Sequence, residues 1–382
     1  MNILQLTDYL PEYPGNFGHT LIAIAKYQSE RNGICIISFP EPRGWHEKIQ
    51  HAGGRLLYLP VFKFKEKKFD QKTISQLNKI IKYNNINIVH VHFGLYQKIL
   101  SIIMKILNPK IKIIWHWRGD VQGKIAFHKK ALIFLFYRVF ADPFVRAHIA
   151  NSRHIYNRLK EKHLTNTNKL FSLHNSIQTR LFKKSLYLGE IENISKKYKT
   201  NTLFTLIMIR NFRRRVDFDI ILDTMEYLKD KEQDIQLLWI GYGETQSEIQ
   251  KKARSRNLQN IVFLGEINNP IPYYYVSNIN IIAWEPWCKE SINNTVYEAL
   301  ACELPVVGLH VGGLPIAFDE TEGVYTVPLN PIHYAEKILF IKEHYPELHQ
   351  AVLKGKRKVL ENYSLKRYVE NLNNIYEKVV YN

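Results

Sequence analysis

Short runs of apolar residues alternate with amphipathic helical patterns along most of the chain. In the first half the runs that read as buried strands are residues 2–6, 34–39, 85–90, 111–115, 147–150 and 170–174. Helical patterns at residues 74–82 and 95–107 lie between them. Strands that alternate with helices are typical of a parallel α/β sheet.

A second series of the same kind follows. Its candidate strands are residues 203–209, 235–240, 261–264, 279–284 and 305–309, and the segment from residue 332 is mostly helical. Residues 185–200 lack the regular spacing of apolar residues seen elsewhere, so we expect an interdomain linker there. A chain of 382 residues suits two domains. We expect one at 1–188, one at 201–365, and a C-terminal helix at 366–382 that packs back on the first.

Composition supports a globular protein, because 46% of the residues are hydrophobic and 13% are aromatic. The net charge is +18, and it is unevenly distributed. Residues 1–190 contain 30 Lys and Arg against 11 Asp and Glu, whereas the remainder contains 23 against 24. A basic half suggests an anionic partner such as phosphate, a lipid surface or nucleic acid. The alternative is a lysine-rich composition without functional meaning.

Cysteine usage and the start of the chain indicate a cytoplasmic protein. Cys35, Cys288 and Cys302 have neither disulfide-framework nor metal-ligand spacing. We see no signal-peptide pattern at the start and no apolar run near the ~18 residues of a membrane span. The basic amphipathic segments 63–68 and 124–138 suit an anionic membrane surface. For the second segment, a buried core helix is the alternative.

Two acids, Glu290 and Glu298, stand eight residues apart around a predicted helix at 295–302. Asn293 and Asn294 occupy helix-capping positions, and a helix start attracts phosphate through its unpaired N–H groups and its dipole. Carboxylates make paired hydrogen bonds to vicinal hydroxyls. Acids on both sides of such a helix start therefore suit a nucleotide sugar. The alternative is a helix with acidic residues in its first turns.

This stretch resembles the C-terminal signature of retaining GT-B glycosyltransferases of family 4, written E-(G/S)-F-x-N/G, E-A-(M/L)-A-x-G-x-P-V-V and G-G-x-P-E. The residues that match in order are Glu290, Ser291, Asn294, Glu298, Ala299, Leu300, Ala301, Cys302, Pro305, Val306, Val307, Gly312, Gly313, Leu314 and Pro315. Three positions depart from the pattern: Ile292 replaces Phe, Glu303 replaces Gly, and Ile316 replaces Glu.

The resemblance implies a fold and a donor site. The fold would be GT-B, with two facing Rossmann-like domains and a central cleft. Glu290 would contact the donor sugar and Glu298 the ribose hydroxyls. The backbone amides that would hold the sugar and diphosphate belong to Ser291, Ile292, Asn293, Asn294 and Thr295.

Other donor contacts fall on strand ends. A basic cluster after the strand at 203–209 contains Arg210, Arg213 and Arg214, and guanidiniums suit a diphosphate leaving group. Asp217 and Asp219 resemble a metal-binding D-x-D, but an acidic first turn of a helix is the preferred interpretation. The remaining donor candidates are Gly265 and Glu266 after a strand, and Gly15 and Gly18 in a glycine loop that also fits a plain turn.

The segment WHWRGD at 115–120 is placed like the family's H-G-x-D turn, whose His reaches the donor sugar. We favour His116 for that role. Alignment on the aspartate would select Trp117 instead, and Arg118 is a rival. His90 and His92 point to one side of a strand, but the sequence shows no third ligand nearby, so we expect no metal.

The resemblance implies sugar transfer with retention by front-face displacement and without metal or cofactor. The expected partners are a nucleotide-diphosphate sugar, a glycan or lipid-linked acceptor, and an anionic surface on the inner face of the cell membrane. A GT-B nucleotide-sugar epimerase is an alternative. A basic nucleic-acid-binding protein is another, but no recognisable module supports it. A nicotinamide oxidoreductase lacks its G-x-G-x-x-G.

Overall fold

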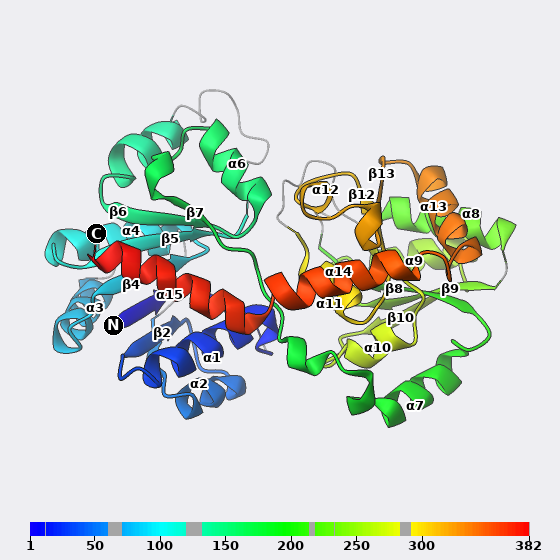
Figure 1. Ribbon diagram of the computed structural model, residues 1–382, viewed down its shortest axis with the longest axis horizontal. Helices are drawn as coiled ribbons and strands as arrows, with labels where there is room; N and C mark the ends of the chain where they lie inside the picture. The colour runs from blue at the N-terminus through cyan, green and yellow to red at the C-terminus, as the bar shows by residue number, and fades with distance from the viewer. Residues whose placement is uncertain are drawn as a thin grey trace. The chain divides into compact units, whose positions relative to one another are not determined.

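The computed structural model describes residues 1–11, 13–59, 71–119, 132–213, 218–232, 234–282 and 292–381. The chain folds as two compact α/β units. The first comprises Met1–Ser176 and Leu365–Asn382, and the second comprises Ile177–Ser364. The polypeptide enters the second unit after Ser176 and returns to the first for its C-terminal helix (Figure 1).

The first unit contains a parallel seven-stranded sheet in the order β3-β2-β1-β4-β5-β6-β7. Its strands are β1 (Ile3–Leu6), β2 (Cys35–Phe39), β3 (Arg55–Tyr58), β4 (Ile88–His92), β5 (Lys112–Trp117), β6 (Val145–Ala150) and β7 (Leu170–Ser172). Its α-helices are α1 (Gly15–Ser29), α2 (Glu47–His51), α3 (Gln71–Tyr83), α4 (Leu95–Leu107), α6 (Arg153–Glu161) and α15 (Leu365–Tyr381). Shorter helical segments are η1 (Gly44–His46), η4 (Thr167–Lys169) and the π-helical η3 (Leu135–Ala141).

Helices cover both faces of this sheet. α1 and α15 pack side by side against one face, and α3, α4, α6 and η3 pack against the other (Figure 1). Every residue of β1, β2 and β4 is buried, which explains why apolar residues predominate in them. α15 belongs here because its buried residues recur every three or four positions: Tyr368, Val369, Leu372, Ile375, Tyr376 and Val379.

The second unit contains a parallel six-stranded sheet in the order β10-β9-β8-β11-β12-β13. Its strands are β8 (Phe204–Ile209), β9 (Ile235–Ile240), β10 (Ile261–Gly265), β11 (Ile279–Ile282), β12 (Val306–Leu309) and β13 (Val324–Val327). Its α-helices are α7 (Leu188–Tyr198), α8 (Asp219–Lys231), α9 (Gln246–Ser255), α10 (Ile271–Tyr275), α11 (Asn294–Ala301), α12 (Leu314–Ala317), α13 (Pro331–Glu343) and α14 (His349–Asn362). Short 3-10 segments are η5 (Thr179–Leu181), η6 (Lys184–Leu186) and η7 (Glu320–Glu322).

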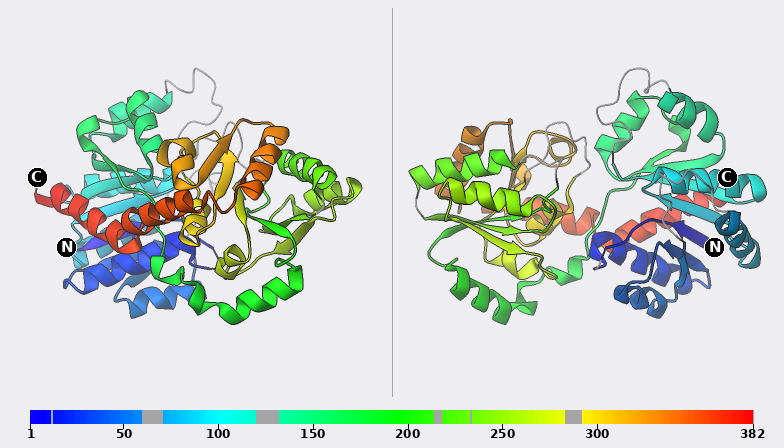
Figure 2. Two further views of the ribbon diagram at one scale, coloured as in Figure 1. Left: turned by 45° about the vertical axis from the view of Figure 1, so that its right-hand side comes forward. Right: turned by 180° about the vertical axis from the view of Figure 1, so that it is seen from behind.

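Two hydrophobic clusters fill the second unit, one on each face of its sheet. α8, α9 and α13 supply the first, and α10, α11 and α14 supply the second. Figure 2 shows helices on both sides of the sheet in each unit. The alternation of strands and helices expected from the sequence is therefore confirmed.

The apolar pattern misses two strands and misassigns one segment. β3 and β13 are not predicted because both are four-residue edge strands, and β3 exposes Arg55 and Tyr58. The linker expected at residues 185–200 is wrong, because this segment contains η6 and α7. α7 fully buries only Ser195, so it shows little apolar rhythm. No helix among the described residues is long and apolar enough to cross a bilayer.

The turn after α11 explains one departure from the family pattern. Glu303 adopts a left-handed conformation with φ of 61°. The N–H of Leu304 donates to the carbonyl of Ala299 at 2.9 Å, and the N–H of Glu303 donates to that of Leu300 at 3.0 Å. These are the hydrogen bonds of a Schellman motif, whose left-handed position favours glycine.

We predict that Glu303→Gly is more stable than Glu303→Ala by about 1 kcal/mol, because only alanine keeps the left-handed strain. Both variants lose the Glu303–Lys356 ion pair, so that term cancels in the comparison. Urea unfolding of the two variants measures the difference. Equal stability, or a more stable alanine variant, would contradict the strain.

Candidate functional site

The sheet of the second unit changes winding direction between β8 and β11. The chain leaves β8 toward β9 on one side and leaves β11 toward β12 on the other. In open parallel α/β sheets, ligands bind beyond the carboxyl ends of the strands at such a switch point. Arg210 directly follows β8, and α11 is the first described helix after β11.

Glycines bring the loop after β9 into direct contact with the loop after β8. A Cβ atom on Gly241 would overlap the carbonyl of Arg210, and one on Gly243 would overlap the carbonyl of Phe212. The N–H of Phe212 donates to the carbonyl of Tyr242 at 3.0 Å, which ties the two loops together. Any other residue type at the two glycines would push these loops apart.

The candidate arginines differ in their surroundings. Arg210 is partly buried, and its carbonyl accepts a hydrogen bond from the indole N–H of Trp239 at 3.3 Å. Arg213 is exposed at the end of the same loop. Arg214 lies outside the described residues. Asp219 begins α8 and accepts two hydrogen bonds from Lys252 at 3.0 Å, as the expected acidic first turn requires.

The start of α11 is capped as the sequence predicts. Asn293 precedes the helix with extended backbone, and its Oδ1 accepts from the N–H of Thr295 at 3.3 Å. The Oδ1 atom of Asn294 is buried without a hydrogen-bond partner among the described residues. Thr295 is buried, and so is Ile292. The side chain of Ile292 belongs to the core, so only its backbone is open to a ligand.

Glu298 is one turn inside α11 and is partly buried. Its Oε2 atom accepts a hydrogen bond from the hydroxyl of Tyr274 on α10 at 2.9 Å. Burial, and then Glu298, raise the pKa of Tyr274 well above its ordinary value, so the phenol remains a donor. The sequence analysis missed Tyr274, since nothing local links it to a residue 24 positions away.

Of the other candidates in the second unit, the structure describes Gly265 and Glu266. Gly265 ends β10, and its carbonyl accepts from the N–H of Gly241 at 2.8 Å. Glu266 follows and is exposed. Glu290 and Ser291 lie outside the described residues.

In the first unit, the glycine loop has a packing explanation. Gly15 is the first residue of α1 and has φ of 49°. At Gly18, a Cβ atom would lie 2.6 Å from Cβ of Pro14 and 3.2 Å from the ring of Trp45. Close packing therefore accounts for Gly18 without a phosphate.

The winding of the first sheet also reverses, between β1 and β4. On the face covered by α15, an apolar residue precedes the polar ends of β1, β4 and β5. The buried polar side chains at this edge are Gln5 on β1, His90 and His92 on β4, and His116 on β5. The sheet register pairs His92 with His116. His116 is therefore the third imidazole that the sequence analysis did not find near His90 and His92.

A chain of hydrogen bonds joins these groups, and Arg118 determines which atom is the donor in the bonds that follow. Nε of Arg118 donates to Nδ1 of His92 at 3.4 Å. Arginine can only donate, so the proton of His92 is on Nε2, 2.8 Å from Oε1 of Gln5. The amide of Gln5 donates to the hydroxyl of Tyr376 at 2.9 Å. That hydroxyl is buried, and Nδ1 of His90, 2.7 Å away, is the acceptor that the described residues offer for its proton, so we assign the proton to this bond.

The same reasoning assigns the protons of the last two imidazoles in this chain of hydrogen bonds. Nε2 of His90 carries its proton and donates to Nδ1 of His116 at 3.3 Å. The proton of His116 is therefore on Nε2, which is buried and has no hydrogen-bond partner among the described residues. His116 thus presents an N–H donor.

Burial lowers the pKa of His90, His92 and His116 well below the ordinary value, and the charge of Arg118 lowers it further. The ring nitrogens of the three histidines lie within 4.8 Å of one another, close enough to hold a metal ion. A metal would have to replace the His90–His116 and Arg118–His92 hydrogen bonds and to tolerate the nearby guanidinium. The arrangement fits a neutral hydrogen-bonded chain better than a metal site.

Trp117 points to the opposite face of the sheet, which removes it as a candidate for the family's histidine. Its indole N–H donates to Nδ1 of His148 at 3.0 Å, and Nζ of Lys98 lies 3.4 Å from the centre of its ring. Trp117 is buried in the core of that face. Of the described residues 115–119, His116 and Arg118 lie at the polar edge.

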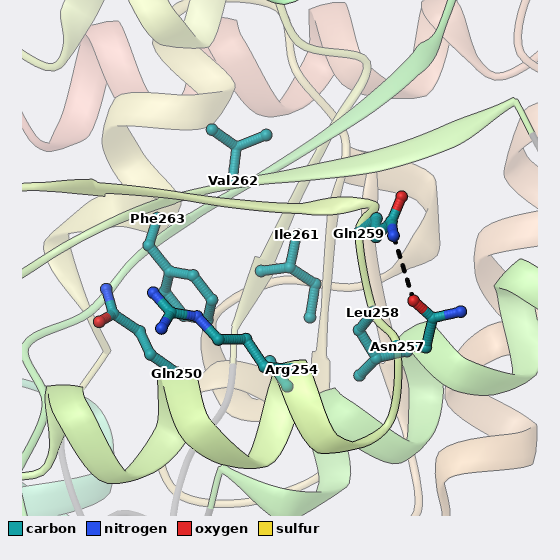
Figure 3. A pocket seen from close by; sticks show the side chains of 9 residues that line it. Gln250, Arg254, Asn257, Leu258, Gln259, Ile261, Val262 and Phe263 are labelled. Carbon is teal, nitrogen blue, oxygen red and sulfur yellow. Dashed lines mark hydrogen bonds between the residues drawn. The ribbon is translucent and has the colours of Figure 1, made fainter.

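An open groove lies between α9 and β10, away from the carboxyl ends of the strands. Figure 3 shows its lining, which comes from α9, the following turn and β10, with the amide of Gln259 donating to Asn257 at 3.2 Å. It contains no carboxylate and only one cation, Arg254. We therefore do not assign it to the donor.

Comparisons with known proteins find similarity to glycosyltransferases. Residues 204–344 match the family model described as glycosyl transferases group 1. The chain is 22% identical over 319 residues to N-acetyl-alpha-D-glucosaminyl L-malate synthase of Bacillus anthracis, which covers 82% of this chain and 80% of that protein. It is 26% identical over 250 residues to the capsular polysaccharide biosynthesis glycosyltransferase CapH of Staphylococcus aureus, which covers 60% of each.

Solved structures are similar over the whole chain. A glycosyltransferase from Rickettsia africae ESF-5 has a TM-score of 0.82 at 17% identity, covering 100% of this chain and 99% of that one. Anabaena Alr3699/HepE in complex with UDP has a TM-score of 0.81 at 13% identity, covering 99% and 100%. The predicted fold class, α/β of the GT-B type with two Rossmann-like domains, is confirmed. Together the comparisons support a glycosyltransferase of the GT-B type.

We predict that the stability of the first unit falls as the pH drops below about 6.5. The three folded-state imidazoles have lowered pKa values, so the unfolded chain binds more protons in that range. The loss should be on the order of 1 kcal/mol per histidine for each pH unit below 6.5. Urea unfolding at pH 7.5 and 5.5 measures it.

The matched variants are His116→Asn, which should reduce this pH dependence, and His51→Asn at an exposed position, which should leave it unchanged. A pH dependence equally strong in both variants would contradict a buried neutral chain.

Proposed function

We propose that this protein moves a sugar from a nucleotide-diphosphate sugar to a glycan or lipid-linked acceptor, and that the second unit binds the donor. One observation carries the proposal. Arg210, Arg213 and the capped start of α11, with Glu298 inside it, follow the two strands at which the sheet reverses, within the range matched by the group 1 model. UDP in a protein of the same fold supports a nucleotide donor.

The carboxylate of Glu298 is the group we assign to the ribose hydroxyls. Tyr274 occupies one hydrogen-bonding direction of Oε2, which orients the carboxylate. An ionised carboxyl has about four acceptor positions, and a pair of vicinal hydroxyls requires two of them. Tyr274 is fully buried and acts as a positioning residue.

The diphosphate is assigned to the arginines and to the start of α11. Arg210, Arg213 and Arg214 would neutralise the charge that develops on the leaving group, and the first N–H groups of α11 would donate to its oxygens. The N–H of Thr295 is the exception, because Asn293 already caps it. Glu290 and the backbone of Ser291 are assigned to the donor sugar by the family resemblance.

For the chemical step we propose front-face displacement with retention. The acceptor oxygen forms a bond to the anomeric carbon while the bond from that carbon to the diphosphate oxygen breaks. The acceptor's proton passes to the leaving diphosphate, so no side-chain nucleophile is required. The protein supplies positioning and charge stabilisation. The family resemblance alone would assign the N–H of His116 to the donor sugar, but the neighbouring Arg118 favours an anionic acceptor group instead.

We expect one or more nucleotide-diphosphate sugars from a panel to release their nucleoside diphosphate in the presence of a glycan or lipid-linked acceptor. Glu298→Gln should weaken nucleotide binding by about 10-fold or more, and Tyr274→Phe by a few-fold, because it removes one hydrogen bond to the charged group. Arg213→Gln should lower turnover more than it weakens binding.

Glu361→Gln is the matched charge control, at an exposed position of α14 in the same unit. Nucleotide binding measured by calorimetry and diphosphate release measured by a coupled assay separate the two effects. Near-normal binding by Glu298→Gln would exclude its assignment to the ribose. Conversion of the sugar without transfer would favour the epimerase alternative.

We also propose that the first unit binds the inner face of an anionic membrane through residues 132–141, which include η3. Tyr137 and Ala141 pack in the core, whereas Leu132, Leu135, Val139 and Phe140 are between 49% and 69% exposed. One side of the segment thus packs in the core, and its exposed side is also apolar. The excess of Lys and Arg in residues 1–190 complements anionic lipids.

Flotation with liposomes tests this surface. Wild-type protein should float with vesicles that contain phosphatidylglycerol at low salt and much less with neutral vesicles. A Val139→Ser/Phe140→Ser double variant should lose several-fold of the binding. Leu186→Ser/Leu188→Ser, at exposed leucines of the second unit, is the control and should bind normally. Equal flotation of wild type and the η3 variant would contradict the proposal.

A further inference from the structure

We propose that Arg118 and the Nε2–H of His116 form an anion-binding site at the carboxyl edge of the first sheet, and that this site takes a phosphate or carboxylate group of the acceptor. The assignment to an acceptor rests on the proposed function. The binding of an anion does not, because it follows from the groups present at this edge.

Arg118 carries a charge that no carboxylate among the described residues neutralises. Its hydrogen bonds go to three neutral groups: Nδ1 of His92 at 3.4 Å, Oδ1 of Asn175 at 3.2 Å and the hydroxyl of Tyr368 at 3.3 Å. Its side chain is only partly exposed. A cation withdrawn from water without a counter-charge is destabilising, and an entering anion removes that cost.

The geometry leaves part of the guanidinium available. Among the described residues, His92, Asn175 and Tyr368 use three of its five N–H groups, which leaves two without a partner there. Aromatic rings line one side: the guanidinium carbon lies 4.2 Å from the ring centre of Phe17 and 5.6 Å from that of Phe93. These contacts hold the group in place without neutralising it.

The backbone is strained directly after β4, at the point where the winding of the sheet reverses. Phe93 directly follows β4 and has φ of 62°, a conformation that is unusual for a bulky residue. Such outliers persist where the surrounding structure holds them, and they occur often at binding sites. The strained conformation places the Phe93 ring beside Arg118.

The hydrogen-bond chain supplies a second donor for the same ligand. Because Arg118 can only donate, the tautomers of His92, His90 and His116 follow in turn, and the last N–H has no partner among the described residues. His116 and Arg118 lie two residues apart at the end of one strand. The guanidinium of Arg118 and the Nε2–H of His116 are therefore both hydrogen-bond donors, and neither is an acceptor. An anionic oxygen satisfies them, whereas a metal ion does not.

The donor diphosphate is a less suitable ligand for this edge. In the proposed function that group is held by Arg210 and Arg213, which belong to the second unit. The first unit also carries the net positive charge of the chain, which favours an anionic partner. An acceptor with a phosphate or carboxylate group fits both observations.

The test is an NMR titration of full-length protein labelled at Arg Nε and at the imidazole nitrogens, with UDP added first to occupy the donor site. Inorganic phosphate is the probe in one arm and malonate in the other, with sodium chloride as the ionic-strength control. We expect saturable shifts of Arg118 Nε–H and His116 Nε2–H at millimolar anion. A response to phosphate alone assigns an acceptor phosphate, and a response to malonate alone assigns a carboxylate.

Arg118→Gln should weaken the binding at least 10-fold, and Arg118→Lys, which keeps the charge, should weaken it less. Arg31→Gln removes an exposed arginine of the same unit and should bind normally. Absence of saturable shifts with either anion, or equal affinity in Arg118→Gln, would overturn the proposal. UDP binding in the same samples reports on the donor site separately, so failure of the proposed function is recognised independently.

Discussion

The backbone contact between the glycine turn after β9 and the loop after β8 is the constraint on which the candidate donor site depends. Gly241 and Gly243 lie against the carbonyls of Arg210 and Phe212, where no side chain fits. The ring of Phe212 stacks on Trp239 at 4.8 Å between ring centres, which anchors the loop to the core. Arg210 therefore leaves the sheet beside the position where the winding reverses.

The two units share the same kind of sheet topology but have different polar groups at the carboxyl edge of the sheet. Each has a wholly parallel sheet whose order reverses next to its first strand, so each has polar groups at the carboxyl edge of that strand. In the second unit these groups are arginines, a capped helix start and the oriented carboxylate of Glu298. In the first they are neutral imidazoles and Arg118, which no carboxylate of the described residues neutralises. Each edge would thus present guanidinium groups to an anionic group, and in the second unit Glu298 adds an acceptor for hydroxyls.

Much of the fold could be predicted from the sequence, because buried parallel strands read as apolar runs and α4 has a clear helical period. The edge strands β3 and β13 and helix α7 could not, since short or weakly buried elements leave little pattern. In the site, the asparagine cap was predictable from local spacing. The partners of Glu298 and of the histidines were not, because Tyr274 and Tyr376 come from distant parts of the chain. Tyr376 is 286 residues from His90.

The choice between His116, Trp117 and Arg118 shows the same limit. Sequence alignment alone leaves the register open by one residue. The strand settles which side chains share a face, because residues two apart point the same way and the residue between them points into the opposite core. Knowledge of the sheet order was needed to see that His90, His92 and His116 meet.

A crystal structure of the protein with bound UDP tests the central claim most directly. The account predicts the diphosphate at the carboxyl ends of β8 and β11, within hydrogen-bond distance of Arg210 or Arg213, with Glu298 on the ribose hydroxyls. A nucleotide bound elsewhere, for example in the groove between α9 and β10, would contradict it.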